Sequence, residues 1–363
     1  MELTKIENAE AIALVLIVSI NHLLLNMPQS ILNSCGSSSL LNTIYTFGLI
    51  LIVSYVLLFV LFKNFSSFDI LDVSRYIGGK KLEKIIGIIC IVYLLSLSGI
   101  FIRNFAEGLK LIYFYKFPIE YILLFFLFTS GIANHFGAKS IIKSNLIIVP
   151  IVLLGLLILF GFSFSSYEPQ RALPILGYGI NQTFLTGATN IFAYNGLFFL
   201  FFLRPLIDIK SNFKKVTYIS IVITGIFVFM AISSLLLSFP TVFSLQELSP
   251  IYYVIRNIHF GTFFQRPEAL FILTWILGVM SYLNCVIFLV LHIFKKITCI
   301  RSSKNMAFSF ICILFFVSLI PQSMSQIRIA EDVLYKYSSL IVTFLIFGSI
   351  LAIANIKYKR NED

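Results

Sequence analysis

The run at positions 11–32 reads AIALVLIVSINHLLLNMPQSIL and is apolar over nearly its whole length. An α-helix needs about 20 apolar residues to cross about 30 Å of hydrocarbon, so this run is long enough to span a membrane. Four polar side chains interrupt it ahead of Pro28: Ser19, Asn21, His22 and Asn26. Because proline removes a backbone hydrogen-bond donor, a membrane helix with this pattern is prone to local unwinding. The run therefore predicts a membrane-spanning helix that is broken near its middle.

Similar apolar runs fill the rest of the chain. Hydrophobic residues make up 59% of the 363 residues, and charged residues make up only 12%. So little polar surface cannot cover a soluble globule of this size, which leaves lipid as the solvent. The runs predict an all-α polytopic membrane protein of about ten transmembrane helices, at residues 11–32, 41–62, 85–106, 119–136, 144–163, 185–207, 216–239, 268–293, 305–321 and 332–355.

The net charge of +11 is spread over the connections between these helices. Lys and Arg gather on the alternate connections that share a side with both chain ends, above all at residues 63–84, 204–215 and 295–304. Cytoplasmic loops of membrane proteins are the ones enriched in Lys and Arg. We therefore predict a multi-pass membrane protein with both termini in the cytoplasm. The basic charge marks its topology and does not indicate a nucleic-acid partner.

No catalytic or cofactor motif stands out. The five cysteines and four histidines are dispersed without metal-ligand spacing. Neither a phosphate-cradling Gly-rich loop ending in Lys-Ser/Thr nor a Gly-x-Ser-x-Gly nucleophile motif is present. The sequence therefore predicts no enzyme, no metal site and no cofactor.

The helix expected at 185–207 carries an interruption like the first one. Ahead of Pro205 it contains Asn190, Tyr194, Asn195 and Gly196. It opens the second five-helix half, as the run at 11–32 opens the first, and the two halves enter the membrane from opposite sides. This pattern indicates an inverted repeat with a binding site near the midplane, between two broken helices. We predict a single integral membrane domain over residues 1–363, with repeats at about 11–163 and 185–355.

The candidate ligand-binding residues lie in the two broken helices and in helices 3 and 8: Ser19, Asn21, His22, Tyr93, Tyr194, Asn195, Gly196, Tyr282 and Asn284. Hydrogen bonding or close packing between helices is the competing interpretation, and it is the favoured one for Tyr93, Tyr282 and Asn284. An ionisable group inside a membrane helix needs a partner or a cavity. His22 therefore either contacts ligand and senses pH, or bonds a neighbouring helix as a neutral imidazole.

Two longer connections have expected structures of their own. Residues 64–84 should carry a short amphipathic helix on the membrane surface. The 240–267 segment contains Pro240, Glu247, Pro250, Tyr252 and Tyr253, and it is either an ordered external lid or a plain connector.

Two stretches carry a family resemblance. RPEALFILTWILGV at 266–279 and LPILGYGI at 173–180 are similar to segments of the spore germination permeases, the B subunits of nutrient germinant receptors. The resemblance covers the whole chain and implies a fold like that of the amino acid/polyamine/organocation transporters. It also implies a place in the spore inner membrane, a small nutrient ligand, and two protein partners, a receptor A subunit and a lipoprotein C subunit.

The chain departs from the family pattern at two places. Asn21-His22-Leu23-Leu24-Leu25 replaces the family's usual Gly-Thr-Gly/Ala-Ile-Leu stretch in helix 1, so the usual ligand pose is not expected. Phe198 stands where a family glutamate is expected, which removes a carboxylate that proton-coupled transport would use.

The resemblance implies a germinant receptor B subunit, and the two broken helices place its small nutrient ligand, such as an amino acid, in a mid-membrane cavity. Ligand would stabilise one arrangement of helices 1 and 6, and the partner subunits would detect that population shift. The alternatives are an active amino acid transporter of the same fold and a purely structural membrane anchor.

Overall fold

The computed structural model describes residues 6–207, 212–240, 250–256, 267–300 and 306–360. Over these ranges the regular structure is helical, apart from an isolated β-bridge between Ile6 and Ile207. Among the described residues, seven helices are long and apolar enough to cross a membrane, and three more apolar helices are shorter. Every predicted span has helical structure at its place, which confirms the all-α polytopic prediction.

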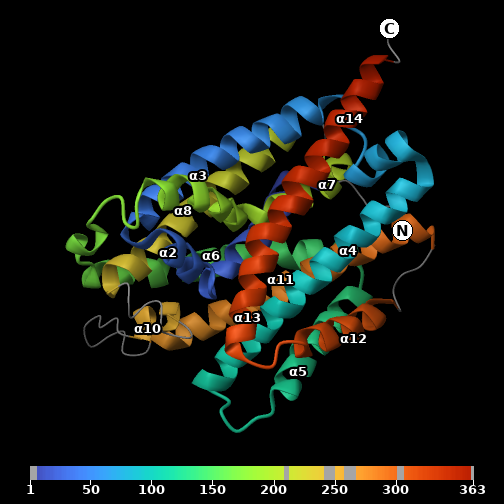
Figure 1. Ribbon diagram of the computed structural model, residues 1–363. Coiled ribbons are helices and arrows are strands. Elements are labelled where there is room, and N and C mark those ends of the chain that lie inside the picture. Colours follow the sequence, from blue (N-terminus) through green and yellow to red (C-terminus); the bar gives the residue numbers. More distant parts are fainter. Residues whose placement is uncertain (1–5, 208–211, 241–249, 257–266, 301–305, 361–363) are drawn as a thin grey trace.

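The first half of the bundle follows the predicted order (Figure 1). Its helices are α1 (Asn8–Ile20), α2 (Met27–Cys35), α3 (Ser39–Ser54, continued as a π-helix to Leu61), α4 (Ile70–Ile112), α5 (Ile119–His135) and α6 (Ala138–Ser163).

The second half begins with the sixth predicted span, called helix 6 and distinct from α6. It is an irregular helix built from a π-turn (Asn181–Leu185), a long 3₁₀ segment (Thr186–Phe199), α7 (Leu200–Leu203) and a last 3₁₀ turn (Arg204–Leu206). The helices that follow are α8 (Asn212–Ser238), α10 (Pro250–Arg256), α11 (Pro267–Thr298) and α12 (Met306–Leu319). Helix 10 starts earlier than predicted: it comprises α13 (Met324–Glu331), two π-helical stretches (Asp332–Ser338 and Leu340–Ile346) and α14 (Phe347–Arg360).

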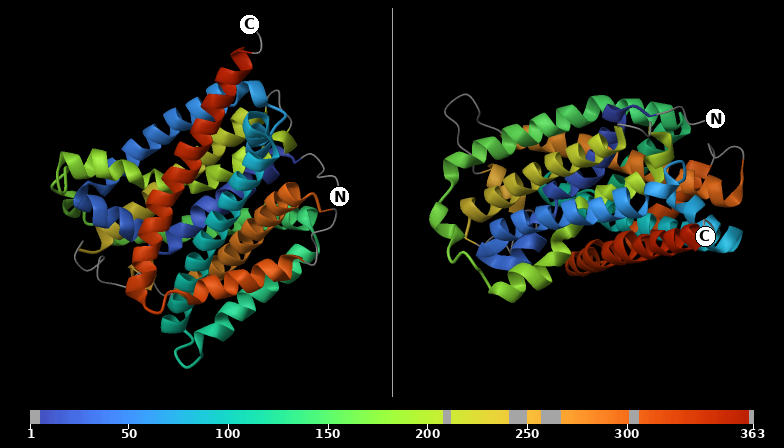
Figure 2. Two further views of the ribbon diagram at one scale, coloured as in Figure 1. Left: turned by 45° about the vertical axis from the view of Figure 1, so that its right-hand side comes forward. Right: turned by 90° about the horizontal axis from the view of Figure 1, so that it is seen from above.

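Helix α1 lies at the centre of the bundle. Its side chains from Ala13 to Ile20 are all buried, and it packs against α6, α8, α11 and the 3₁₀ part of helix 6. A helix that is apolar on all sides is expected to be surrounded by other helices. The start of α1 and the end of α14 lie at the same end of the bundle, and the segment at 164–180 lies at the other end (Figure 2).

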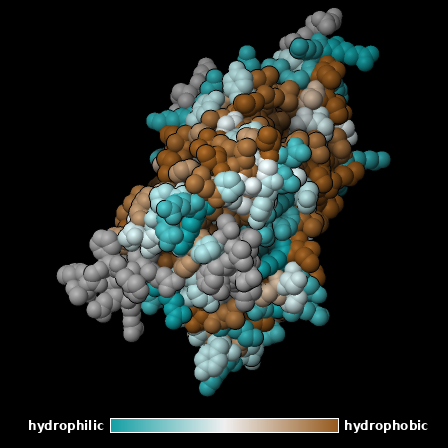
Figure 3. All heavy atoms as spheres, turned by 60° about the vertical axis from the view of Figure 1, so that its left-hand side comes forward, coloured by the Kyte–Doolittle hydropathy of each residue, from teal (hydrophilic) through white to brown (hydrophobic). Residues whose placement is uncertain are grey.

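The outer surface has the hydropathy of a membrane protein. Large hydrophobic side chains such as Ile52, Phe125, Leu154 and Phe316 are exposed. In Figure 3 hydrophobic residues cover much of the visible face, while hydrophilic residues gather at its upper end, beside the end of α14, and across its lower part. A soluble protein would bury such residues, so this apolar face fits contact with lipid.

The connection at 64–84 contains the predicted helix, joined to helix 3. Helix α4 runs from Ile70 through a kink at Gly78 and Gly79, so helix 3 begins before residue 85. The carboxylate of Asp69 caps α4 by accepting from the backbone N–H groups of Leu71 and Asp72. Helix α11 is anchored here, because Lys296 Nζ lies 2.6 Å from a carboxylate oxygen of Asp69 and of Asp72.

The 240–267 connection is described only in part. Residues 250–256 form α10, whose Ile251 and Ile255 are buried and which packs on α8 and α11. The aromatic ring of Tyr252 lies 5.7 Å from that of Phe271 on α11. Part of this connection is therefore an ordered helix, while residues 241–249, including Glu247, and 257–266 lie outside the described residues.

Candidate functional site

Helix 1 breaks where the sequence predicts it. Helix α1 ends at Ile20, a 3₁₀ turn covers Asn21–Leu24, and Leu25 has φ −107° and ψ −140°, outside the helical region. Helix α2 then starts at Met27 with Pro28 in its first turn, where a missing N–H costs no hydrogen bond. The polar residues Asn21, His22 and Asn26 of the break are all buried. The break therefore places polar side chains inside the bundle.

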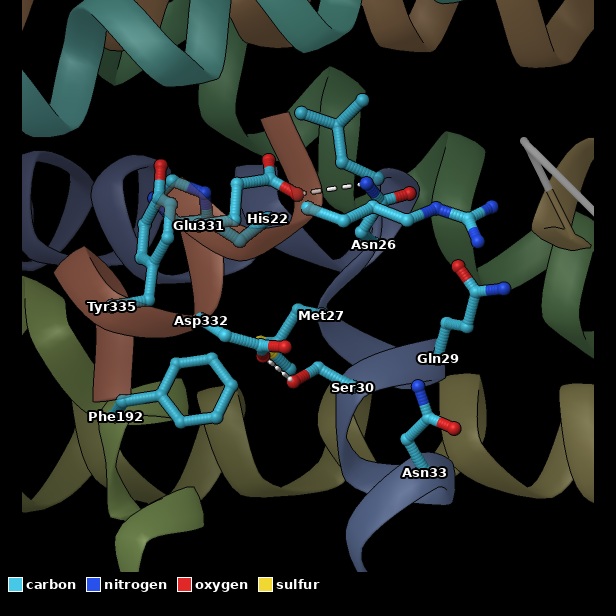
Figure 4. A pocket seen from close by; sticks show the side chains of 12 residues that line it. His22, Asn26, Met27, Gln29, Ser30, Asn33, Phe192, Glu331, Asp332 and Tyr335 are labelled. Carbon is cyan, nitrogen blue, oxygen red and sulfur yellow. Dashed lines mark hydrogen bonds between the residues drawn. The ribbon is translucent and has the colours of Figure 1, made fainter. Parts of the chain in front are cut away.

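A pocket opens beside this break. It is lined by twelve residues from helix 1, helix 6 and helix 10: His22, Leu25, Asn26, Met27, Gln29, Ser30, Asn33, Phe192, Arg328, Glu331, Asp332 and Tyr335. Figure 4 shows the break and α2 on one side and helix 10 on the other. The free space of about 50 Å³ fits a few water molecules, since one buried water needs about 10–15 Å³. A larger ligand requires the two sides to separate.

Glu331 is the buried carboxylate of this pocket, with 8% of its surface exposed. Its Oε2 accepts from Asn26 Nδ2 at 2.7 Å, and its Oε1 accepts from Asn104 Nδ2 of α4 at 2.7 Å (Figure 4 draws the first bond). The next residue, Asp332, accepts from Ser30 Oγ at 2.6 Å and lies 3.3 Å from Lys336 Nζ. Helix 10 is thus bonded through its acidic residues to Asn26 at the end of the helix 1 break and to Ser30 of α2.

His22 lies between three aromatic rings. Its ring centroid is 4.8 Å from that of Phe101, 5.3 Å from that of Tyr282 and 4.5 Å from that of Tyr335, each in an edge-to-face arrangement. Its Nε2 is buried and has no hydrogen-bond partner among the described residues. A buried polar atom that is left unpaired costs about 1–3 kcal/mol, so His22 is suited to a partner that a ligand brings.

Ser19, Asn21 and Gly196 lie where helices cross. A β-carbon on Gly196 would overlap Ser19 Oγ and the carbonyl oxygen of Val15, so helix 6 touches the backbone of α1 at this glycine. Ser19 Oγ bonds the Val15 carbonyl at 3.1 Å. Asn21 Nδ2 donates to the carbonyl oxygen of Gly278 on α11. These contacts match the packing interpretation of the three residues.

The remaining candidates lie deeper in the bundle. Tyr93 of α4 donates to Asn195 Oδ1 at 2.9 Å and so joins helix 3 to helix 6. The Tyr194 hydroxyl is buried near Gly225 of α8. Tyr282 packs on His22, and the backbone carbonyl of Asn284 accepts from Asn134 at 3.4 Å. Of the nine predicted residues, His22 is the one that lines the described pocket.

Phe198 occupies an aromatic cluster at the position of the expected family glutamate. Its ring lies 5.3 Å from Phe347, 5.2 Å from Phe202 and 5.4 Å from Tyr93, measured between centroids. With 1% of its surface exposed, Phe198 fills space between helices 3, 6 and 10.

Sequence reasoning missed the acidic residues of helix 10 and Asn104 of helix 3. The predicted start of the tenth span at residue 332 leaves Glu331 outside the span, whereas helix 10 starts at Met324 and places Glu331 inside the bundle. Two adjacent carboxylates at the head of an apolar run were the available signal, because ionisable residues in a membrane segment indicate function.

The LPILGYGI stretch packs against the end of α2, the second part of helix 1. The Pro174 carbonyl accepts from Ser37 Oγ at 2.6 Å. Gly177 has φ +52°, and a β-carbon there would overlap the Cys35 carbonyl oxygen. The Tyr178 ring packs over Gly36. This stretch therefore needs its glycine for a close backbone approach.

The RPEALFILTWILGV stretch forms the first half of α11, apart from Arg266, which lies outside the described residues. Trp275 is buried between Phe105 and Phe271, with ring centroids 4.8 Å and 5.2 Å away. Gly278 accepts the Asn21 side chain at its carbonyl. Both family-like stretches thus contact helix 1 or the helices that enclose it.

Two solved structures share this fold. A crystal structure of MhsT in complex with L-phenylalanine aligns over 95% of this chain and 91% of that chain, with a TM-score of 0.67 and 16% identity. A substrate-bound outward-open Na⁺-coupled sialic acid symporter aligns over 95% and 77% of the two chains, with a TM-score of 0.64 and 12% identity. These likenesses support the inverted-repeat fold with broken helices 1 and 6.

Sequence comparison agrees with the resemblance of the two stretches. Spore germination protein A2 of Bacillus subtilis (strain 168) is 22% identical over 275 residues, which are 74% of this chain and 74% of that protein. The model of the spore germination protein family matches residues 5–327. The chain therefore belongs to the spore germination protein family of multi-pass, permease-like membrane proteins.

Proposed function

We propose that this chain is the B subunit of a nutrient germinant receptor, which binds a small nutrient, such as an amino acid, beside the helix 1 break and so triggers germination. The observation that carries the proposal is the pocket between the break and helix 10, where a buried carboxylate and an unpartnered imidazole nitrogen face space for a ligand. The proteins of similar fold named above are described as complexes with L-phenylalanine and with a substrate.

Ligand would act on this pocket by separating or joining its two sides. Helix 10 and helix 1 are held together by the Asn26–Glu331 and Ser30–Asp332 hydrogen bonds. A nutrient that replaces these bonds favours the state in which it fits, and only such differential affinity can shift the population. Helices 1 and 10 are then the moving parts that partner subunits detect.

A secondary amino acid transporter of the same fold is the second candidate, and the transporter neighbours favour it. One observation favours a sensor. Phe198 places an aromatic ring where proton-coupled transport would use a carboxylate.

Radiolabelled amino acids offered to liposomes that contain the purified chain distinguish the candidates. Saturable binding without accumulation is the expected result for a sensor, whereas concentrative uptake supports the transporter. Absence of both leaves a structural anchor. Spores that lack the chain should also lose their response to at least one nutrient, and a normal response to every amino acid, sugar and nucleoside would contradict the receptor role.

The proposal also covers the location of the protein in the cell and its partner subunits. We propose the spore inner membrane as the location, both termini in the cytoplasm, and an A subunit and a lipoprotein C subunit as partners. The family membership and the distribution of Lys and Arg support this arrangement. Crosslinking in dormant spores, followed by purification of this chain, should recover both partners. Labelling of cysteines placed near each end should require membrane permeabilisation.

A further inference from the structure

We infer that the nutrient carries a protonated amine and that the carboxylate of Glu331 binds it. The inference rests on the proposed function, because it names the chemical class of ligand for that same pocket. It favours amino acids and other small amines over sugars and nucleosides, which carry no positive charge.

The first observation is the surroundings of the Glu331 carboxylate. It is buried in the bundle, and its two described hydrogen bonds come from the amides of Asn26 and Asn104. Amides satisfy hydrogen bonds but carry no positive charge, and a buried carboxylate in a membrane helix is costly unless a cation lies near it. A carboxylate accepts about four hydrogen bonds, so each oxygen keeps room for a further donor. An ammonium group supplies both the donors and the opposite charge.

The second observation is His22, which is 6% exposed and whose Nε2 has no hydrogen-bond partner in the part of the chain that the structure describes. It lines the same pocket, and its ring packs on Tyr335, which lies one helical turn beyond Glu331 on helix 10. His22 and Asn26 of the break therefore face Glu331 and Tyr335 of helix 10. A ligand placed between them can meet the carboxylate and the free imidazole nitrogen together.

The other charges of the pocket fit an amino acid. Asp332 adds a second carboxylate nearer to solvent, and Arg328 lines the pocket three residues before Glu331. Charges of both signs on one wall suit a zwitterion. A neutral sugar or nucleoside supplies no positive charge to pair with the Glu331 carboxylate, so a site built around that carboxylate should bind it more weakly than an amine.

The test compares probes that differ only in the amine. Full-length protein in lipid nanodiscs is titrated with L-leucine and with its 2-hydroxy analogue, and likewise with L-alanine and lactate, L-phenylalanine and phenyllactate, glucose and inosine. We expect at least one amino acid to bind, with its hydroxy analogue weaker by at least about tenfold. Equal binding of the two members of a pair would overturn the inference without any variant.

Variants then assign the effect to Glu331. Glu331→Gln keeps the shape and removes the charge, and it should weaken amino acid binding by about tenfold or more. Glu331→Asp keeps the charge and should retain part of the binding. Glu107→Gln is the matched control, because Glu107 pairs with Arg103 at 2.9 Å outside the pocket and its replacement should leave binding unchanged. Unchanged amino acid affinity in folded Glu331→Gln would overturn the inference.

The remaining outcomes separate this inference from the proposed function. If glucose or inosine binds and the amino acids do not, the inference is wrong and the nutrient receptor stands. If no probe of any class binds the wild-type chain, the proposed function fails and the inference fails with it. Exchange of Na⁺ for K⁺ at constant ionic strength tests for an inorganic cation. A change in the thermal midpoint on this exchange that Glu331→Gln abolishes, without amine binding, would assign Glu331 to that ion instead.

Discussion

Gly196 of helix 6 and Ser19 of helix 1 lie so close together that a β-carbon on Gly196 would overlap the Ser19 hydroxyl. The two broken helices therefore touch near their breaks with no side chain between them on the helix 6 side. Small residues allow such an approach between membrane helices. The contact couples helix 1 to helix 6, so a ligand-driven movement of helix 1 against helix 10 should also move helix 6.

Replacement of Gly196 should destabilise the protein. Gly196→Ala should lower the free energy of unfolding by about 1–3 kcal/mol, because the added methyl group must displace the α1 backbone. The thermal midpoint in detergent measures the effect. Gly48→Ala in α3 is the matched control, since no atom lies within 4 Å of its added carbon, and it should be neutral or stabilising. A stable Gly196→Ala protein with altered nutrient binding would instead support a ligand contact at this glycine.

The bond between Asn104 and Glu331 should appear as an energetic coupling. Asn104→Leu leaves one buried carboxylate oxygen without its donor and should cost about 1–3 kcal/mol of stability. In the background of Glu331→Leu the same change should cost much less, because no carboxylate remains to be satisfied. Additive effects of the two changes would show that the hydrogen bond contributes nothing measurable. The readout is a double-mutant cycle of thermal unfolding in detergent.

Replacement of His22 should change stability and nutrient affinity in opposite directions. His22→Phe preserves contacts with Phe101, Tyr282 and Tyr335 and removes the unpartnered Nε2, so stability should be equal or higher. Nutrient affinity should fall by about tenfold if Nε2 bonds the ligand. Affinity and thermal midpoint are measured on the same nanodisc preparation. A variant that keeps wild-type affinity would remove His22 from the binding site. A variant that loses stability would show that the imidazole makes a stabilising contact that phenylalanine cannot replace.

The anchor between α4 and α11 predicts a pH dependence. Burial raises the pKa of the Asp69 carboxyl from 3.8 to about 6, although the nearby Lys296 favours its ionised form. Between about pH 4 and pH 6 the folded protein therefore holds a proton that the unfolded chain releases. The contribution of Asp69 to stability is fully present below pH 4 and is lost as the pH rises through 6.

Asp69→Asn should flatten this part of the pH profile. Asparagine still caps α4 but cannot titrate, so the thermal midpoint of the variant should change less between pH 4 and pH 6. Glu120→Gln, at an exposed carboxylate in α5, should leave the wild-type slope in place. A slope that survives in Asp69→Asn would assign the pH dependence to another group.

The sequence determined the spans, the break in helix 1 before Pro28 and the absence of familiar catalytic motifs, because these depend on local properties. An apolar run must satisfy its backbone hydrogen bonds within a helix in lipid, and proline interrupts them wherever it stands. The sequence also singled out His22, because an ionisable residue inside an apolar run is conspicuous without a structure. It could not say which of the polar residues in the broken helices face a cavity and which face another helix.

The tertiary structure alone decided how the pocket is made. Asn26 meets Glu331 across 305 residues of sequence, and Asn104 meets it across 227. Asn195 turns to Tyr93 and Gly196 to Ser19, so two predicted site residues serve contacts between helices in this structure. Helical periodicity assigns a side chain to a face but does not specify which helix of an interleaved repeat lies opposite that face. That choice depends on how ten helices pack together, because packing brings distant polar groups into one site and satisfies others in pairs.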